Sequence, residues 1–185
     1  MTTNGNLSKQ IAKLAEHKKF QIIETLSMEK YSKVCYELGK YYYSQKQFDA
    51  AFVWFTEAGD HRESNALYYL SIICENKYIK DNGRGPSLED VANYYMELAI
   101  KFNSPLALCD MGERLIYGRG VEKDYEKGLN LLFKAKALKY YRASEILSRC
   151  YTHGFGVEAD LEKAHELLKE SYNLLAEKYY SQEGE

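Results

Sequence analysis

Proline is almost absent from this sequence, which has only 2 in 185 residues. Because proline breaks the interior of a helix, its scarcity leaves long stretches free to be helical. An excess of charge of one sign is also missing, since 25 basic side chains stand against 27 acidic ones, for a net charge of -2. This balance argues against a nucleic-acid partner or an anionic membrane surface, either of which usually requires a basic patch.

Long apolar runs are missing as well. No run approaches the roughly 18 residues that a bilayer-spanning helix needs. The first residues, Met1 to Leu7, are too polar to be the apolar part of a signal peptide. We therefore expect a cytoplasmic protein with no membrane partner.

Closely paired metal ligands are absent too. The cysteines are widely spaced and include no Cys-x-x-Cys pair, and the four histidines show no ligand spacing with them. The four cysteines are Cys35, Cys74, Cys109 and Cys150. Zinc sites normally show close ligand pairs, so we expect buried free thiols, no metal site and no other cofactor.

An internal repeat of 36 residues is the strongest signal that the sequence does contain. Residues 116–135 and 152–171 align without gaps. The shared positions include Gly118/Gly154, Gly120/Gly156, Val121/Val157, Asp124/Asp160 and Lys127/Lys163. Such self-similarity is typical of a repeat protein, in which each copy is one supersecondary unit.

Each copy contains two segments with helical periodicity. In the last copy, residues 143–151 and 164–172 both place apolar or small residues at i, i+3, i+4, i+7 and i+8. This spacing forms one stripe on a helix of 3.6 residues per turn. Small residues recur where the two helices would cross: Gly39, Ser71, Gly112 and Ser148 on the first helices, and Ala51, Ala92, Gly128 and Ala164 on the second. We expect them to let the helix axes approach closely.

The ends of the helices carry matching signals. Gly118 and Gly154 are predicted to end a helix, because glycine adopts the left-handed conformation without strain. Asp124 and Asp160 are predicted to begin the next helix, where a carboxylate accepts hydrogen bonds from unpaired N–H groups. Further N-terminal caps are predicted at Ser87 and at Ser104, which precedes a proline.

The sequence contains no recognisable catalytic motif. The glycine-rich loops at Gly118 and Gly154 each follow a predicted helix and lack the Lys-Ser/Thr of a phosphate-binding loop. Cys150 and His153 lie about one helical turn apart, but no carboxylate that would orient the histidine is implied. We expect no catalytic residues and no enzyme, with a hydrolase of unrecognised site as a distant alternative.

In its 36-residue repeat and in the glycines and aspartates at its helix ends, the sequence resembles the Sel-one-like repeat (SLR) family, a branch of the tetratricopeptide repeat (TPR) solenoids. The family signature is Ala-x3-Leu-Gly-x2-Tyr-x2-Gly-x-Gly-Val-x2-Asp-x2-Lys-Ala. The last two copies follow it with Met111 for Leu, Ser148 for Gly and Gly128 for Ala, whereas the first copy looks more like a plain TPR. The resemblance implies an all-α protein, a right-handed α-solenoid of about four helix–turn–helix repeats with N- and C-terminal capping helices.

The repeats are predicted to span residues 31–173, as copies at 31–62, 63–103, 104–139 and 140–173. Residues 1–30 are predicted to form an N-terminal capping helix or a degenerate repeat, and residues 174–185 a C-terminal helix extension with a frayed tail. The connection at residues 77–86 is five residues longer than the repeat spacing requires, so we expect an exposed loop there.

The resemblance places the first helix of each copy on a concave face, where the stripe opposite the packing positions should be exposed and bind a partner. The stripe is aromatic and basic in the early copies and of mixed charge in the late ones: Lys33, Tyr36, Lys40, Tyr43, Asn65, Tyr68, Ile72, Glu113, Ile116, Arg142, Glu145 and Arg149. Tyrosine offers a large contact area at low entropic cost, and the basic members could hold carboxylates. The tyrosines could equally fill space between neighbouring helices.

The sequence thus predicts a non-enzymatic protein–protein interaction module, an adaptor or assembly scaffold, whose concave face binds a peptide or a helix of another protein. The alternative is a regulatory or inhibitory subunit that acts through the convex face or the 77–86 loop. The fold cannot choose between them, because repeat proteins share a scaffold while their recognition surfaces diverge.

Overall fold

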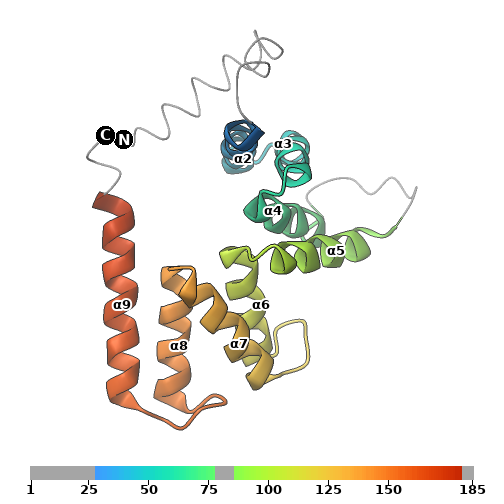
Figure 1. Cartoon of the computed structure of the whole chain (residues 1–185). Helices are drawn as coiled ribbons and strands as arrows, with labels where there is room; N and C mark the ends of the chain where they lie inside the picture. The colour runs from blue at the N-terminus through green and yellow to red at the C-terminus, as the bar shows by residue number, and fades with distance from the viewer. Residues whose placement is uncertain (1–27, 78–85, 181–185) are drawn as a thin grey trace. The chain divides into compact units, whose positions relative to one another are not determined.

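The computed structural model describes residues 28–77 and 86–180, and every regular element among them is an α-helix (Figure 1). The chain forms two compact units, Met1–Phe102 and Asn103–Glu185. The first contains α2 (Met28–Ser44), α3 (Phe48–Asp60), α4 (Ser64–Glu75) and α5 (Leu88–Lys101). The second contains α6 (Pro105–Tyr117), α7 (Tyr125–Ala137), α8 (Tyr141–His153) and α9 (Leu161–Tyr180). The predicted all-α fold of paired helices is confirmed.

Two predicted features fall almost entirely outside the described residues. One is the capping helix or degenerate repeat of residues 1–30, of which only 28–30 are described, at the start of α2. The other is the loop at 77–86, of which only the two end residues are described. At the C-terminal end, α9 continues to Tyr180.

Helix packing inside each unit follows the order of the chain. In the first unit α2 packs on α3, α3 on α4 and α4 on α5, and in the second unit α6 to α9 pack in the same way. The first helices of consecutive pairs also touch, α2 with α4 and α6 with α8. The predicted stripe residues of one unit therefore lie on two helices that contact each other.

The predicted helix ends are confirmed. Gly118 and Gly154 adopt left-handed φ angles of 71° and 70° just after α6 and α8. The carboxylate of Asp124 accepts a hydrogen bond from the Lys127 N–H at 3.0 Å, and Asp160 does the same for the Lys163 N–H at 2.9 Å. Ser87 and Ser104 cap α5 and α6 through their hydroxyl oxygens. These groups satisfy donors that a helix leaves unpaired at its first turn.

The crossing of α6 and α7 depends on the two predicted glycines. A Cβ atom on Gly112 would lie 2.9 Å from Leu132 Cγ and 3.0 Å from the carbonyl oxygen of Gly128, and one on Gly128 would lie 3.1 Å from the Gly112 oxygen. In the next pair the equivalent positions make a hydrogen bond instead, since the Ser148 hydroxyl donates to the Ala164 carbonyl at 2.7 Å. Small residues at these crossings thus bring the backbones into close contact, as the sequence predicts.

The first unit is centred on Phe55, which is fully buried. One face of its ring stacks on Tyr69, with the centroids 4.7 Å apart and the planes 6° from parallel. A Cβ atom on Gly39 would lie 2.5 Å from the ring, so only glycine leaves room for it there. Phe55 of α3 therefore packs against both α2 and α4.

All four cysteines are free and buried, as the sequence predicts. Burial raises the pKa of Cys35, Cys74 and Cys150 to about 11 and that of Cys109 to about 12. In the described residues no three His, Cys, Asp or Glu side chains are grouped so that they could hold a metal ion. Within the same residues, no helix has the length and apolar character needed to cross a membrane.

We expect these thiols to react very slowly with alkylating reagents while the protein is folded. With a pKa of about 11, roughly 0.1% of a thiol is ionised at pH 8, and only the thiolate is the nucleophile. Treatment of the native protein with iodoacetamide at pH 8 should leave it unmodified by mass spectrometry, whereas the protein in guanidinium chloride should gain four adducts. Rapid modification of any one cysteine in the native protein would contradict this prediction.

Candidate functional site

The predicted stripe of the first unit lies on α2 and α4. Two of its members belong to an aromatic cluster, which we define as Tyr36, Tyr43, Phe55 and Tyr69. The centroid of the Tyr69 ring is 6.1 Å from that of Tyr36 and 5.2 Å from that of Tyr43. The two predicted tyrosines are half-buried. They therefore fill space between helices, the alternative left open above, and are also partly exposed to solvent.

The remaining stripe residues of this unit are partly engaged within the chain. Lys33 forms an ion pair with Glu29 at 2.7 Å, and Lys40 pairs with Glu37 at 2.9 Å while its amine lies 5.2 Å from the centre of the Tyr36 ring. Exposed pairs of this kind contribute little to stability and can exchange partners. On α4, the side chains Asn65, Tyr68 and Ile72 are all half-buried.

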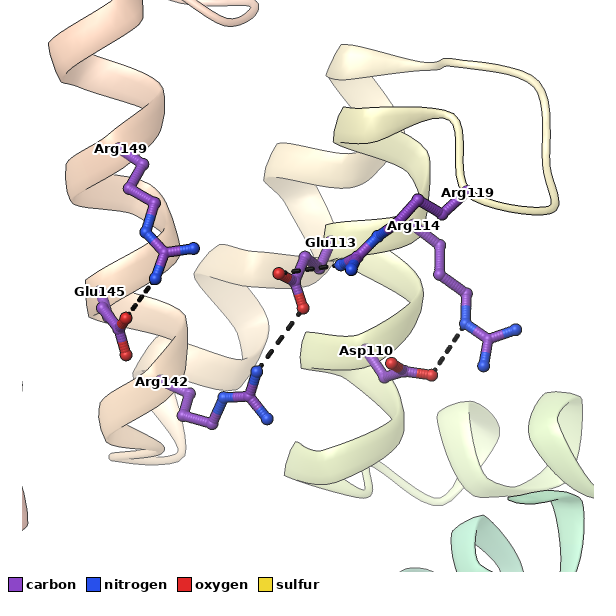
Figure 2. A network of polar contacts seen from close by, with 7 residues as sticks. All are labelled: Asp110, Glu113, Arg114, Arg119, Arg142, Glu145 and Arg149. Atoms are coloured by element: carbon purple, nitrogen blue, oxygen red, sulfur yellow. Dashed lines mark hydrogen bonds and ion pairs between the residues drawn. The ribbon is translucent and has the colours of Figure 1, made fainter. Parts of the chain in front are cut away.

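Four of the predicted residues of the second unit, together with Arg119, form a polar ladder, which we define as Glu113, Arg119, Arg142, Glu145 and Arg149 (Figure 2). One carboxylate oxygen of Glu113 lies 2.8 Å from the Arg119 guanidinium, and the other lies 3.7 Å from that of Arg142. Further along α8, Arg149 pairs with Glu145, which lies four residues before it. The structure therefore brings Glu113 of α6 and Arg142 of α8 together across two neighbouring first helices, whereas the Arg149–Glu145 pair stays within α8.

The charges of the polar ladder are not equally accessible. The Glu113 side chain is only 13% exposed, whereas those of Arg119 and Arg142 are 57% and 50% exposed. In the second pair Arg149 is 49% exposed and Glu145 35%. The guanidinium groups thus face the solvent, while the carboxylates, Glu113 above all, lie closer to the protein.

The arginines of the ladder keep their charge. Burial lowers the pKa of Arg142, but its interactions with Tyr140, Cys109 and Glu113 outweigh this, so the pKa is raised above the ordinary value. For Arg149 burial likewise lowers the pKa, and the interactions with Tyr117 and Glu145 raise it overall. The surface of α6 and α8 therefore carries permanent positive charge at its outer edge.

The exposure predicted for Ile116 is wrong. Its side chain is only 1% exposed and packs against α7, so close that a Cβ on Gly128 would lie 3.0 Å from Ile116 Cδ1. The reason is helical geometry, because Ile116 follows the crossing residue Gly112 by four positions and so lies on the same face. Ile116 is part of the core.

Two residues of these surfaces were not predicted. Tyr69 belongs to the aromatic cluster, although the predicted stripe contained its neighbour Tyr68 instead. Its place beside the buried Leu70 did not indicate that it would contact the rings of α2. Arg119 reaches Glu113 from inside the glycine loop, which the sequence suggested only as a helix end. In both cases the contact joins separate helices or a loop, so periodicity along one helix could not indicate it.

The Cys150–His153 pair does not have the features of an activated nucleophile. Cys150 is fully buried and its pKa is raised to about 11 by burial. A catalytic thiol needs the opposite, a lowered pKa and access to solvent. His153 is exposed and lies against the Phe155 ring, with centroids 5.4 Å apart.

Consecutive helix pairs, joined by short turns and packed through small residues, define a helical repeat protein. A family model described as Sel1 repeat matches residues 26–62, 105–140 and 140–174. These ranges cover more than half of the sequence, so the chain belongs to the Sel1 repeat family. Repeats of this family typically mediate protein interactions and are generally non-catalytic.

Two solved structures show the same fold. The chain is similar to a Sel1 repeat protein from Oxalobacter formigenes at 20% identity and a TM-score of 0.64, over 90% of this chain and 69% of that one. It is also similar to c5321, a protective antigen present in uropathogenic Escherichia coli strains displaying an SLR fold, at 21% identity and a TM-score of 0.58. The second match covers 80% of this chain and 33% of that one, so this chain spans about a third of its length. A search of curated proteins gave no match.

Proposed function

We propose that the chain is a non-enzymatic interaction module, an adaptor or assembly scaffold, that binds a peptide or a helix of another protein along its first helices. The binding residues would be the predicted stripe without Ile116, on α2 and α4 in one unit and on α6 and α8 in the other. The family supports this role in general, since its repeats typically mediate protein interactions.

One observation supports the first-helix face in particular. Glu113 of α6 and Arg142 of α8 meet at 3.7 Å, so polar side chains of two consecutive first helices form one continuous surface. A partner segment lying across α6 and α8 would meet the guanidinium groups of Arg119, Arg142 and Arg149, and arginine is enriched in protein interfaces. The proposal includes a cytoplasmic location, which the four unpaired and buried cysteines favour.

Affinity capture from the native cell lysate, followed by mass spectrometry, tests this proposal. The variant Tyr36→Ala/Tyr43→Ala/Tyr68→Ala removes aromatic contact area from the first helices and is expected to lose the partner that the wild-type chain retains. Because Tyr36 and Tyr43 also contact the buried Phe55, circular dichroism must first show that the variant is folded.

A matched control removes three tyrosines that lie on second helices instead. Tyr94, Tyr172 and Tyr179 are 58%, 64% and 64% exposed, and their replacement by alanine should leave capture unchanged. Retention by the first-helix variant together with loss by this control would contradict the proposal and move the site to the second helices.

A further inference from the structure

The polar ladder has the charge arrangement of a surface that receives negative groups. It contains three guanidinium groups and two carboxylates, an excess of one positive charge. The excess is larger at the surface, because Glu113 is nearly covered while the arginines are about half exposed. A partner approaching this part of α6 and α8 therefore meets cations first.

The arginines also have a defined spacing. Arg142 and Arg149 are seven residues apart on α8, which is two turns and about 10 Å along the axis. Arg119 is held beside Arg142 because both contact the Glu113 carboxylate. Seven residues is also the distance at which two side chains share a face of a partner helix.

The pairs inside the ladder can be exchanged. The Arg142–Glu113 contact is long, at 3.7 Å, and Glu113 divides its charge between two arginines. Arg142 is half exposed and its contact with Glu113 is longer than a hydrogen bond, so an incoming carboxylate can compete for Arg142 while Arg119 stays paired with the covered Glu113. Guanidinium groups also bind carboxylates through two parallel hydrogen bonds, which the long contact does not provide.

We propose that the polar ladder binds an acidic helical segment of the partner, whose carboxylates two turns apart take the places that Glu113 and Glu145 occupy in the free protein. This inference rests on the proposed function and specifies the chemistry of the partner. Glu113 then acts as an internal competitor that lowers the affinity for acidic segments. Removal of its charge should tighten binding, while removal of Arg142 should weaken it.

The test uses the full chain and a fluorescein-labelled helical peptide with glutamates at i and i+7, measured by fluorescence anisotropy. Glu113→Gln is expected to bind this peptide about threefold more tightly than the wild type, and Arg142→Gln about fivefold less tightly. Two charge-matched controls, Glu122→Gln and Lys134→Gln, change exposed residues of the same unit outside the ladder and should alter the affinity less than twofold. A twin peptide with glutamine in place of glutamate should not bind.

The outcomes separate the two proposals. Tighter binding by Glu113→Gln supports the inference and cannot arise from loss of folding. Equal effects of Glu113→Gln and Glu122→Gln would overturn it, because general charge would then explain the binding. If the chain captures a partner from lysate but neither binds the acidic peptide nor responds to Arg142→Gln, the inference fails and the proposed function stands. Failure of both assays refutes both.

Discussion

Replacement of Phe55 by alanine is expected to lower the free energy of unfolding of the α2–α5 unit by about 3 to 5 kcal/mol. The ring is fully buried, stacks on Tyr69 and lies directly over Gly39. Its removal leaves a cavity that the rigid neighbours cannot fill, so the loss combines the transfer of the ring with the cost of the empty space. Urea unfolding followed by the fluorescence of Trp54, the single tryptophan of the chain, measures the effect.

Val53 provides the matched control on the same helix. Its side chain is 62% exposed, so Val53→Ala should change the free energy of unfolding by no more than about 0.5 kcal/mol. If Phe55→Ala lowers the free energy of unfolding by less than about 1 kcal/mol, the aromatic cluster does not form the core of this unit. Tyr36 and Tyr43 would then contribute little to its stability.

Replacement of Gly112 by valine should destabilise the α6–α9 unit by about 3 kcal/mol, the upper end of the range for overpacked cores. Even the first added carbon would meet Leu132 at 2.9 Å and the backbone oxygen of Gly128 at 3.0 Å. The Leu132 side chain can rotate away, but the Gly128 carbonyl oxygen cannot move unless the whole of α7 shifts with it. Urea unfolding monitored by circular dichroism gives the loss.

Gly120→Ala separates steric overlap from backbone strain. Gly120 has a φ angle of 72°, and a Cβ there would meet nothing within 4 Å. Its replacement should therefore cost only the left-handed conformation, about 1 kcal/mol. Equal losses for the Gly112 and Gly120 variants would argue against the close crossing of α6 and α7.

The parts of the fold that depend on local chemistry were predictable from the sequence. Gly118 and Gly154 ended helices as expected because few other residues adopt a positive φ without strain, and Asp124 and Asp160 capped the helices that follow. The helix crossings were predictable too, since small residues repeated at a fixed spacing mark the positions where two helix backbones come close.

Other helix ends could not be predicted because ordinary side chains adopt the same backbone conformation. After α3, α5 and α7 the chain turns through Arg62, Asn103 and Lys139, with φ angles of 64°, 56° and 58°. Neither arginine nor lysine signals such a turn, and the surrounding packing must enforce it.

The candidate site shows the same division. The stripe on the first helices was predicted from the family resemblance, and the structure brings two of its members, Glu113 and Arg142, together. The burial of Ile116 was missed, although Ile116 follows the crossing residue Gly112 by four positions and therefore lies on the same helix face. The contact between Arg119 and Glu113 could not be predicted, because the glycines of a loop do not determine the direction in which the loop folds back.

The glycine loops of the second unit have a consequence for how such a chain can change its length. Gly118 and Gly120 have φ angles of 71° and 72°, and Gly154 and Gly156 both have 70°. The chain thus leaves each first helix in the same direction and enters the next through an equivalent aspartate. A gene segment encoding 36 residues, the spacing of the two loops, can therefore be duplicated or deleted between them with both joints intact. Evolution can in this way lengthen or shorten the stack of helices one helix pair at a time.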